Sequence, residues 1–349
     1  MHITHLSGRL PGNLNFVFEY DATPDGQWIV GEVEPRDFAD NNTFLPYVAL
    51  YNVGSHQVVR VHNLLNPHSQ IGSVATDGTW IVWQEASHQP DFVDWVIEAD
   101  NWRTGTFKRL AQAPTDANGV FYHGPQPQLA VDQGKALWSQ TTGPIDPNDS
   151  STSQNEEVRL ADLNTGAITT LATSAFGAAL SWPWAAWGVL TDANGNGFVQ
   201  FKDMETGQTI RLNQTPDKLA LSGTTAVYSL YANEVDVIPD VSHSTVGRTI
   251  FQVTTPSLQS PVVSSRLVAW SYTDGPNIPL VWDRQENVLV VLPTTYIQNY
   301  IAWTGGHLLA WLDSPETAAQ QQQDGQNNLI PSLDMCIVDT NALPTTLPA

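Results

Sequence analysis

Cysteine is nearly absent from the sequence: Cys336 is the only one in 349 residues. A single cysteine excludes a disulfide framework within the chain and a thiolate metal cluster. Cys336 stands in an apolar run and is expected to be a small buried residue rather than a nucleophile. A lone cysteine is compatible with either redox compartment, so it assigns none.

Basic residues are also scarce, with 14 Lys and Arg against 35 Asp and Glu and a formal net charge of −21. Nucleic acids and anionic membrane surfaces are bound by basic patches, so the composition argues against both as partners. Cations, basic proteins and neutral ligands such as glycans are left. An apolar content of 41% with 13 Trp is too high for a disordered acidic chain.

Long hydrophobic runs are missing as well. No stretch approaches the ~18 apolar residues of a membrane-spanning helix, so membrane insertion is not expected. The first residues, Met-His-Ile-Thr-His, contain no apolar segment typical of a signal peptide. The chain is then either cytoplasmic or a mature or excised domain. Its low lysine content, many Gln, Asn and Thr residues and strong acidity favour an extracellular or cell-surface location.

A repeat does stand out in the sequence. A turn containing Gly, Asp or Ser precedes three or four apolar residues that usually end in Trp, as in Asp77-Gly-Thr-Trp-Ile-Val-Trp83. Seven copies occur, spaced 41 to 55 residues apart, with anchors at Gly31, Trp83, Trp138, Trp187, Tyr228, Trp270 and Trp311. A period of ~40–45 residues is typical of a four-stranded propeller blade. We expect the aromatic anchors to pack between blades.

A second element follows each anchor: an apolar strand, a polar turn and another strand, as in Val158 to Leu171. Asn101, Asp162, Asp203 and Asp283 each lie four residues before the Gly or Asn of this turn. An Asx side chain there can accept hydrogen bonds from the turn backbone, and Gly supplies the positive φ. These residues are therefore expected to be structural rather than catalytic.

The pattern predicts an all-β, seven-bladed β-propeller of four-stranded antiparallel blades in a single domain, residues 1–349. The predicted blades cover approximately 14–62, 70–111, 126–173, 177–214, 218–255, 260–293 and 298–347, the last with 2–7. The seventh blade has almost no chain left for a fourth strand, whereas residues 2–7 resemble the fourth strands elsewhere. We expect the N-terminus to complete that blade and close the ring, which removes two exposed sheet edges.

The repeat resembles that of the WD-like, TolB-type β-propeller family, whose blades carry a Pro-Asp-Gly turn before an aliphatic-aromatic strand. Pro24-Asp25-Gly26 matches this turn, and Asp77-Gly78 matches it in part. The resemblance spans nearly the whole chain and implies an architecture. It does not imply an activity, because the fold hosts scaffolds, lectins, hydrolases and lyases.

Long polar insertions follow the anchor strand in blades one, two, three and seven, and loops on a rigid scaffold commonly carry binding sites. The alternative is that these insertions are a solvated surface without a ligand. We interpret the Gln-rich tract 320–323 in this way. Trp95 and Trp102 flank a strand of blade two and could be stacking platforms for a sugar ring, although packing is the competing interpretation. The candidate binding residues are Asp37, Asp40, Asp91, Asp94, Trp95, Trp102, Asp146 and Asp149.

One loop has metal-like spacing. Asp192, Asn194, Asn196 and the Phe198 carbonyl occupy positions 1, 3, 5 and 7 of a calcium loop, so Ca²⁺ is a candidate cofactor. Asp203 occupies position 12, but an intervening strand would carry it about 17 Å away. Asn-Gly is also the commonest hairpin turn signal, which makes a plain hairpin the competing interpretation.

The sequence offers little evidence for a catalytic site. The sequence contains no Gly-x-Ser-x-Gly, no His-Glu-x-x-His and no phosphate loop, and its nine His are scattered. We therefore predict a recognition or scaffold propeller that binds a protein partner through its long acidic loops. The alternatives are a polysaccharide lyase or hydrolase with a site at the central channel, and a glycan-binding lectin. An enzyme would need two or three titratable groups converging at one end of the channel.

Overall fold

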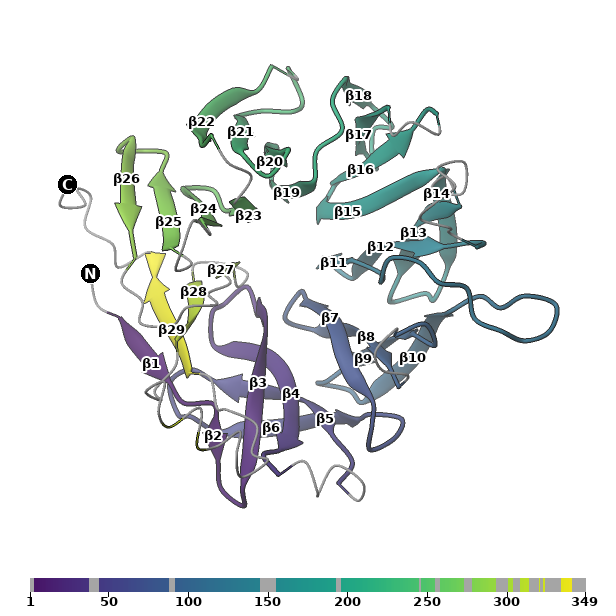
Figure 1. The fold of residues 1–349 in the computed structure, drawn as a ribbon, viewed down its shortest axis with the longest axis vertical. Coiled ribbons are helices and arrows are strands. Elements are labelled where there is room, and N and C mark those ends of the chain that lie inside the picture. Colours follow the sequence, from purple (N-terminus) through teal and green to yellow (C-terminus); the bar gives the residue numbers. More distant parts are fainter. Residues whose placement is uncertain are drawn as a thin grey trace.

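Seven β-sheets are arranged around a ring in the computed structural model of the chain (Figure 1). The structure describes residues 3–37, 44–87, 92–144, 155–192, 196–244, 246–254, 258–272, 278–292, 301–303, 308–313, 320, 323 and 334–340. Six sheets have four antiparallel strands and one has five. The prediction of an all-β, seven-bladed propeller is confirmed. In the described ranges, no helix is long and apolar enough to cross a membrane.

The first three blades contain strands β2 to β14, and their innermost strands are β3, β7 and β11. Blade one comprises β2 (Arg9–Leu10), β3 (Leu14–Ala22), β4 (Trp28–Pro35), β5 (Tyr47–Asn52) and β6 (Val58–Asn63). Blade two comprises β7 (Gln70–Thr76), β8 (Trp80–Ala86), β9 (Val96–Asn101) and β10 (Thr106–Gln112). Blade three comprises β11 (Leu129–Asp132), β12 (Lys135–Thr141), β13 (Glu156–Asp162) and β14 (Ile168–Thr173).

The remaining blades contain β15 to β29. Blade four comprises β15 (Ala175–Ser181), β16 (Trp184–Leu190), β17 (Gly197–Asp203) and β18 (Thr209–Leu212). Blade five comprises β19 (Lys218–Ser222), β20 (Thr225–Leu230), β21 (Glu234–Ile238) and β22 (Arg248–Gln252). Blade six comprises β23 (Leu258–Val263), β24 (Leu267–Tyr272), β25 (Ile278–Asp283) and β26 (Val288–Val291). Blade seven comprises β27 (Ile301–Trp303), β28 (Leu308–Asp313), β29 (Asp334–Asp339) and β1 (Thr4–Leu6).

The N-terminal strand closes the ring as predicted. β1 pairs antiparallel with β29, with Thr4 opposite Ile337 and Leu6 opposite Met335. Leu6 is fully buried in a cluster that joins blades one and seven. In Figure 1 the purple β1 and the yellow β29 lie side by side, although they come from opposite ends of the chain.

The aromatic anchors lie on the second strand of each blade and pack as expected. Trp83, Trp138, Trp270 and Trp311 are among the largest fully buried side chains, and Tyr228 occupies the same register in blade five. Blade one has Gly31 there instead. A methyl group on Gly31 would overlap the Val17 carbonyl oxygen and the Phe16 ring, so Phe16 fills the space that Trp takes elsewhere.

The turns between third and fourth strands are closed by Asx side chains. In five blades one Oδ1 atom accepts hydrogen bonds at 2.8–3.3 Å from the backbone N–H groups two and three residues later; the residues are Asn52, Asn101, Asp162, Asp203 and Asp283. The predicted structural role of the last four is confirmed. The Lys135 ammonium and the turn N–H groups lower the pKa of Asp162 to about 2.

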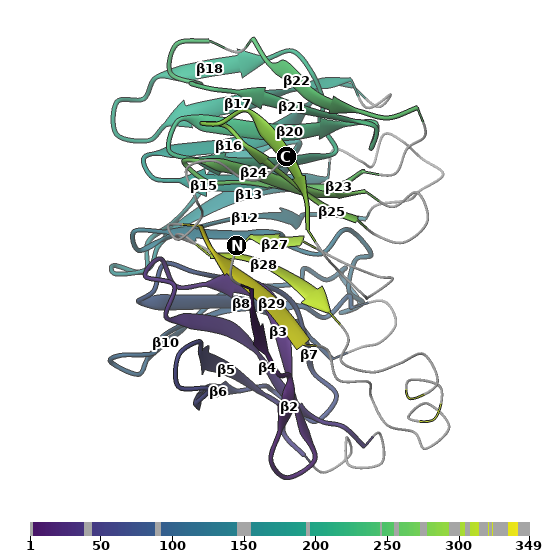
Figure 2. The same cartoon turned by 90° about the vertical axis from the view of Figure 1, so that its left-hand side faces the viewer.

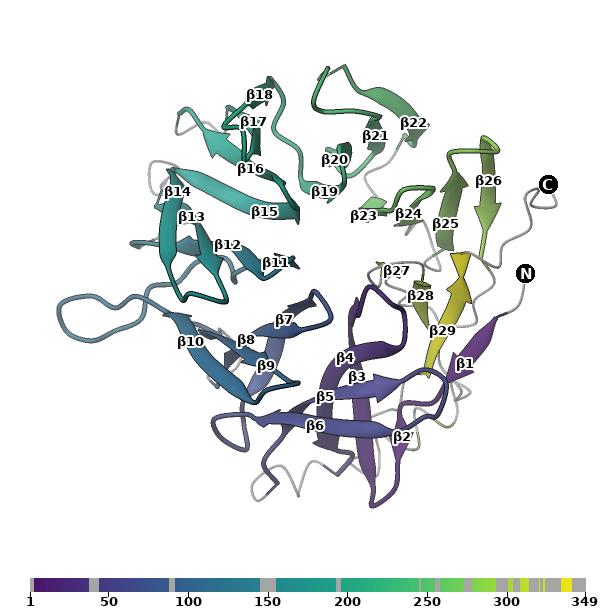
Figure 3. The ribbon, with the colours of Figure 1, turned by 180° about the vertical axis from the view of Figure 1, so that it is seen from behind.

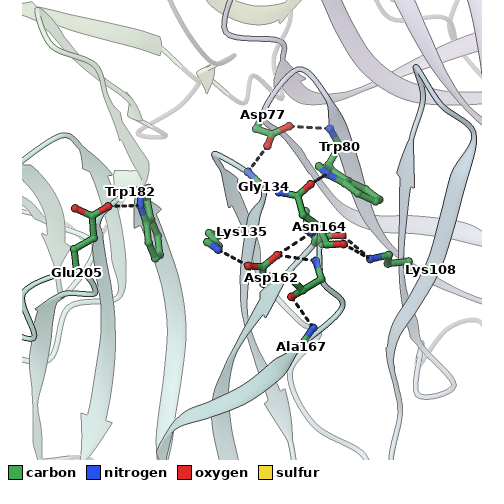
Figure 4. A network of polar contacts seen from close by, with 12 residues as sticks. Asp77, Trp80, Lys108, Gly134, Lys135, Asp162, Asn164, Ala167, Trp182 and Glu205 are labelled. Carbon is green, nitrogen blue, oxygen red and sulfur yellow. Dashed lines mark hydrogen bonds and ion pairs between the residues drawn. The ribbon is translucent and has the colours of Figure 1, made fainter.

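Three other acidic side chains tie together the first four blades. Asp21 accepts a hydrogen bond from Thr76 N at 2.5 Å, Asp77 accepts one from Gly134 N at 2.6 Å, and Asp132 accepts one from Trp182 N at 2.7 Å. Figure 4 shows the tie between blades two and three, where Lys108 Nζ also donates to the Leu163 carbonyl oxygen at 2.6 Å. Part of the negative charge is therefore used to hold the ring together.

Candidate functional site

The four long insertions leave the same face of the ring. Each connects the second strand of a blade to its third, between β4 and β5, β8 and β9, β12 and β13, and β28 and β29. Because the blades have the same strand order around the ring, these connections emerge together; we call this side the insert face. Figure 2 shows the ring from its side, so that its two faces lie to the left and right.

A cavity of about 250 Å³ opens among the strand ends of blades three, four and five, and we call it the blade-four cavity. Glu156 enters it from the start of β13, directly after the blade-three insertion, and Asp217 and Lys218 enter from the start of β19. The full lining is Pro125, Gln126, Gln128, Ser139, Glu156, Phe176, Gly177, Ala178, Trp187, Gly188, Val199, Pro216, Asp217, Lys218 and Leu219. The cavity is therefore part apolar and part charged, and it lies on the insert face.

Glu156 is the acid that the cavity perturbs most. Burial raises the pKa of its carboxyl group to about 7, because the charged form loses hydration there. The neighbouring Glu157 points to the opposite face of the strand and is paired with Arg159 at 2.6 Å. Two adjacent glutamates thus differ in role: Glu157 holds the blade together, whereas Glu156 can change charge near neutral pH.

Trp187 brings an unused hydrogen-bond donor to the same lining. The indole nitrogens of Trp83 and Trp138 donate to the side chain two residues later, to Glu85 at 3.1 Å and Gln140 at 2.8 Å. In blade four that position is Val189, which cannot accept a hydrogen bond. Trp187 is 4% exposed, and its Nε1 has no hydrogen-bond partner within the described part of the chain. A buried donor without a partner costs about 1–3 kcal/mol, which a ligand oxygen would recover.

The rim of the cavity carries charges of both signs. Asp217 and Lys218 are exposed, and Asp217 Oδ2 accepts a hydrogen bond from Ala232 N at 2.8 Å. Phe176 and Val199 provide the apolar wall, and the Phe176 ring occupies the space beside Gly188. A ligand that places a cation near Glu156 and an apolar group against Phe176 would match this lining.

The predicted binding residues that the structure describes do not line this cavity. Asp94 accepts hydrogen bonds from the Ser87 N–H, at 3.0 Å, and from the Ser87 hydroxyl, across the base of the blade-two insertion. Asp37 follows β4 and is half-buried. Asp40, Asp91, Asp146 and Asp149 lie outside the described residues.

Neither candidate Trp is an open platform. Trp95 is 3% exposed and belongs to the core between blades two and three, so its interpretation as a solvent-facing stacking surface is wrong. Trp102 is half-buried, packs against Trp28 with 5.7 Å between ring centroids, and donates to the Gly78 carbonyl at 3.1 Å. It lies in the turn between β9 and β10, on the face opposite the insertions. For both residues the competing interpretation, packing, accounts for the contacts.

The calcium-like loop joins β16 and β17. Asn196 donates its side-chain N–H to Asp192 Oδ2 at 2.7 Å, and its carbonyl accepts the Thr191 N–H at 2.8 Å, as in a hairpin. Phe198 lies in β17 opposite Val189, and the Arg211 guanidinium stacks 3.6 Å above its ring. Asp203 pairs with Trp184 at the far end of that ladder, as expected. Asn194 lies outside the described residues, and the described ones contain no cluster of three or more His, Cys, Asp or Glu that could hold a metal.

Calcium titration separates the two interpretations of this loop. If Ca²⁺ binds, raising it to about 100 times its Kd should increase the free energy of unfolding by about 2.7 kcal/mol. Asp192→Ala should remove that increase, whereas Asp203→Asn should keep it, because Asp203 lies at the other end of β17. A hairpin without metal predicts the same melting temperature with calcium and with a chelator.

The pKa of Glu156 makes stability depend on pH in a stated direction. The folded pKa of about 7 exceeds the ordinary 4.5, so between these values the folded state binds more protons and stability falls as pH rises. The free energy of unfolding of Glu156→Gln should therefore equal that of the wild type near pH 4.5 and be about 1–3 kcal/mol higher at pH 8. Thermal melts from pH 4.5 to 8 test this; a difference that does not grow with pH would contradict it.

The blade-four cavity is only partly indicated by the sequence. Glu156 directly follows the blade-three insertion at the start of β13, but nothing in the sequence distinguishes it from Glu157. Trp187 was assigned to packing by its register. A partial signal was the residue two positions after the anchor, where Val189 replaces the acceptors Glu85 and Gln140. It is not sufficient, because Trp270 Nε1 also lacks a partner among the described residues although Tyr272 follows it.

Comparison with known proteins establishes the fold alone. No family model matches the chain, and no curated protein matches its sequence. A solved prolyl endopeptidase structure is similar with a TM-score of 0.57 at 10% identity, over 85% of this chain and 47% of that one. The β-propeller domain of the Trilobed protease from Pyrococcus furiosus also gives a TM-score of 0.57 at 10% identity, over 89% and 92%. This chain therefore spans about half the length of the endopeptidase.

TolB from Acinetobacter baumannii is a further structural neighbour, with a TM-score of 0.47 at 13% identity over 83% of this chain and 66% of TolB. The predicted propeller architecture is shared with the β-propeller domain of the Trilobed protease, which matches at a TM-score of 0.57. At sequence identities of 10–13%, these similarities assign no activity and no partner to this chain.

Proposed function

We infer that the chain is a recognition propeller whose insert face binds a protein partner through its acidic loops and the blade-four cavity. The observation that carries this proposal is the cavity itself, where a carboxyl group with a pKa of about 7 and an indole N–H with no partner among the described residues stand beside an apolar wall. Such a lining fits a Lys or Arg side chain that is followed by an apolar residue. Burying the cation beside Glu156 would stabilise the ionised carboxylate.

The net charge supports a basic partner. At −21 the chain attracts positively charged proteins over long range and accelerates their encounter with it. Asp21, Asp77 and Asp132 are used between blades, whereas acids near the insertions and at Glu156 and Asp217 lie on the insert face, where they could meet a partner. Binding should consequently weaken as salt concentration rises.

A random heptapeptide library displayed on phage, selected on the immobilised protein at pH 8, tests the proposal directly. The enriched peptides should contain Lys or Arg beside an apolar residue. For such a peptide, Glu156→Gln should raise the Kd at least tenfold, and binding to the wild type should weaken below pH 7 as the carboxyl group is protonated.

Glu205→Gln is the matched control, because it removes the same charge from an exposed turn on the other face. Trp187→Phe removes the indole N–H while keeping an aromatic ring, and should weaken the peptide by a smaller factor. Peptides without a basic residue, or equal affinity for the wild type and Glu156→Gln, would contradict the proposal.

An enzyme acting on polysaccharide is the second candidate, and the pKa of Glu156 is the observation that favours it. A carboxyl group that titrates near pH 7 can act as a general acid or base. Such an enzyme would depolymerise a glycan, and Glu156→Gln would abolish that activity while peptide selection would find nothing. A lectin would instead bind oligosaccharides without cleaving them, so a glycan array followed by product analysis separates the three functions.

A further inference from the structure

We propose that a groove between blades five and six, on the face opposite the insertions, binds a peptide segment that carries a carboxylate side chain next to an apolar one. The groove has a volume of about 500 Å³, and its lining includes Val237, Arg248, Ile250, Arg266, Trp282 and Arg284. Three of the 14 basic residues of the chain thus gather in one place. Figure 3 shows these blades side by side, as β19–β22 and β23–β26.

The fold itself does not require an arginine at position 284. In four other blades the residue in the same place donates its backbone N–H to the turn between the first two strands and is apolar; these residues are Val53, Leu163, Met204 and Val241. The Arg284 N–H makes the equivalent bond to the Arg266 carbonyl at 3.0 Å. Leu163 and Val241 are fully buried at this position. Arg284 therefore places a charged side chain where four other blades have an apolar one.

One of the three arginines is already neutralised. Arg266 donates Nε and Nη2 to Asp283 Oδ2 at 2.9 and 2.6 Å, and Glu286 lies close enough to raise its pKa. The Arg266–Asp283 ion pair in blade six is equivalent to the Lys135–Asp162 ion pair in blade three. Arg266 is therefore part of the scaffold of the groove, and the ligand charge must be met by the other two.

Arg248 and Arg284 have only neutral partners among the contacts of the described residues. Arg284 Nη1 donates to the Ser264 and Ser265 carbonyls at 3.3 and 3.2 Å, which holds the guanidinium in place. Arg248 Nη2 donates to Asn287 Oδ1 at 3.3 Å and lies 5.4 Å from the centre of the Trp282 ring. Desolvation by burial lowers the pKa of Arg284, as expected for a cation that an anion would stabilise.

The walls of the groove decide the class of ligand. A guanidinium binds a carboxylate through paired, charge-assisted hydrogen bonds. Val237, Ile250 and the Trp282 ring add apolar surface that a bare carboxylate would leave uncovered. A polyanion such as nucleic acid would be repelled by the net charge of −21. A short peptide segment with one Glu or Asp between apolar residues satisfies all three conditions.

Isothermal titration at low salt with the probe acetyl-Leu-Glu-Leu-amide tests the proposal. The wild type should bind the probe, and acetyl-Leu-Gln-Leu-amide should bind at least tenfold more weakly. Arg284→Leu should also weaken the Glu peptide at least tenfold. It should still fold, because it restores the residue type of the other blades, and its melting temperature verifies this. Arg248→Gln, at an exposed position, provides a second loss variant.

Arg103→Gln is the control for charge alone, since Arg103 is exposed on blade two. It should leave the affinity for the Glu peptide unchanged. Equal binding to the wild type and Arg284→Leu would overturn the proposal. If glutarate bound as tightly as the Glu peptide, the proposal that the ligand is a peptide would be wrong. If phosphate bound more tightly than either, the proposal that the groove recognises a carboxylate would be wrong.

Discussion

Deleting residues 1–7 is expected to lower the stability of the chain by at least about 3 kcal/mol, and to do so by opening the ring. β1 is the outer strand of blade seven, and its removal exposes the edge of β29 to solvent. It also removes Leu6, which is fully buried against blade one. The urea midpoint of the deletion variant measures the loss.

A point variant separates the loss of the contact between blades one and seven from the removal of the whole N-terminal segment. Leu6→Ala should cost about 2–5 kcal/mol, because it leaves a cavity where blades one and seven meet. His5→Gln, on the exposed side of the same strand, should cost less than about 1 kcal/mol. If the deletion variant unfolded at the wild-type urea concentration, the ring would not depend on β1.

Replacing Trp138 by Ala is expected to cost about 3–5 kcal/mol of stability. Trp138 is fully buried on β12 and packs with Val82, Trp95 and Leu163, which belong to two adjacent blades. Its Nε1 donates to Gln140 Oε1 at 2.8 Å, so the truncation also leaves a buried acceptor without its partner. Denaturant unfolding measures the change.

Phe107→Ala is the matched control for that substitution. Phe107 is 41% exposed on β10 and stacks on His62 with 4.3 Å between ring centroids. It should cost less than half as much as Trp138→Ala, because less apolar surface is lost from the core. Comparable losses for both variants would show that the tryptophan register does not carry the contacts between blades.

The two faces of the ring differ in the ligands that they suit. The blade-four cavity presents a carboxyl group and apolar walls on the insert face, whereas the blade-five and blade-six groove presents guanidinium groups on the other. A propeller with opposite charge preferences on its two faces could hold two partners at once. Glu156→Gln and Arg284→Leu should therefore each weaken the binding of one peptide at least tenfold and leave the affinity for the other unchanged.

The architecture could be predicted from the sequence because each blade repeats the same local physics. Alternating apolar residues, an aromatic anchor and an Asx-closed turn recur at a blade-length period, and seven such units close only as a ring. The roles of Asp162 and Asp203 followed from spacing within one turn, where contacts are local. The N-terminal closure followed from a missing strand in the seventh unit.

The sites could not be predicted in this way, since each joins strands that are far apart in the chain. Glu156, Trp187 and Asp217 come from three blades, and only the ring brings them to one cavity. Trp95 lacked the anchor register but is buried, because a neighbouring blade covers it. By itself the sequence determined the repeat, the turns and the closure, which depend on local periodicity. Only the tertiary structure decided which polar groups lose their water, because desolvation depends on the neighbouring blades.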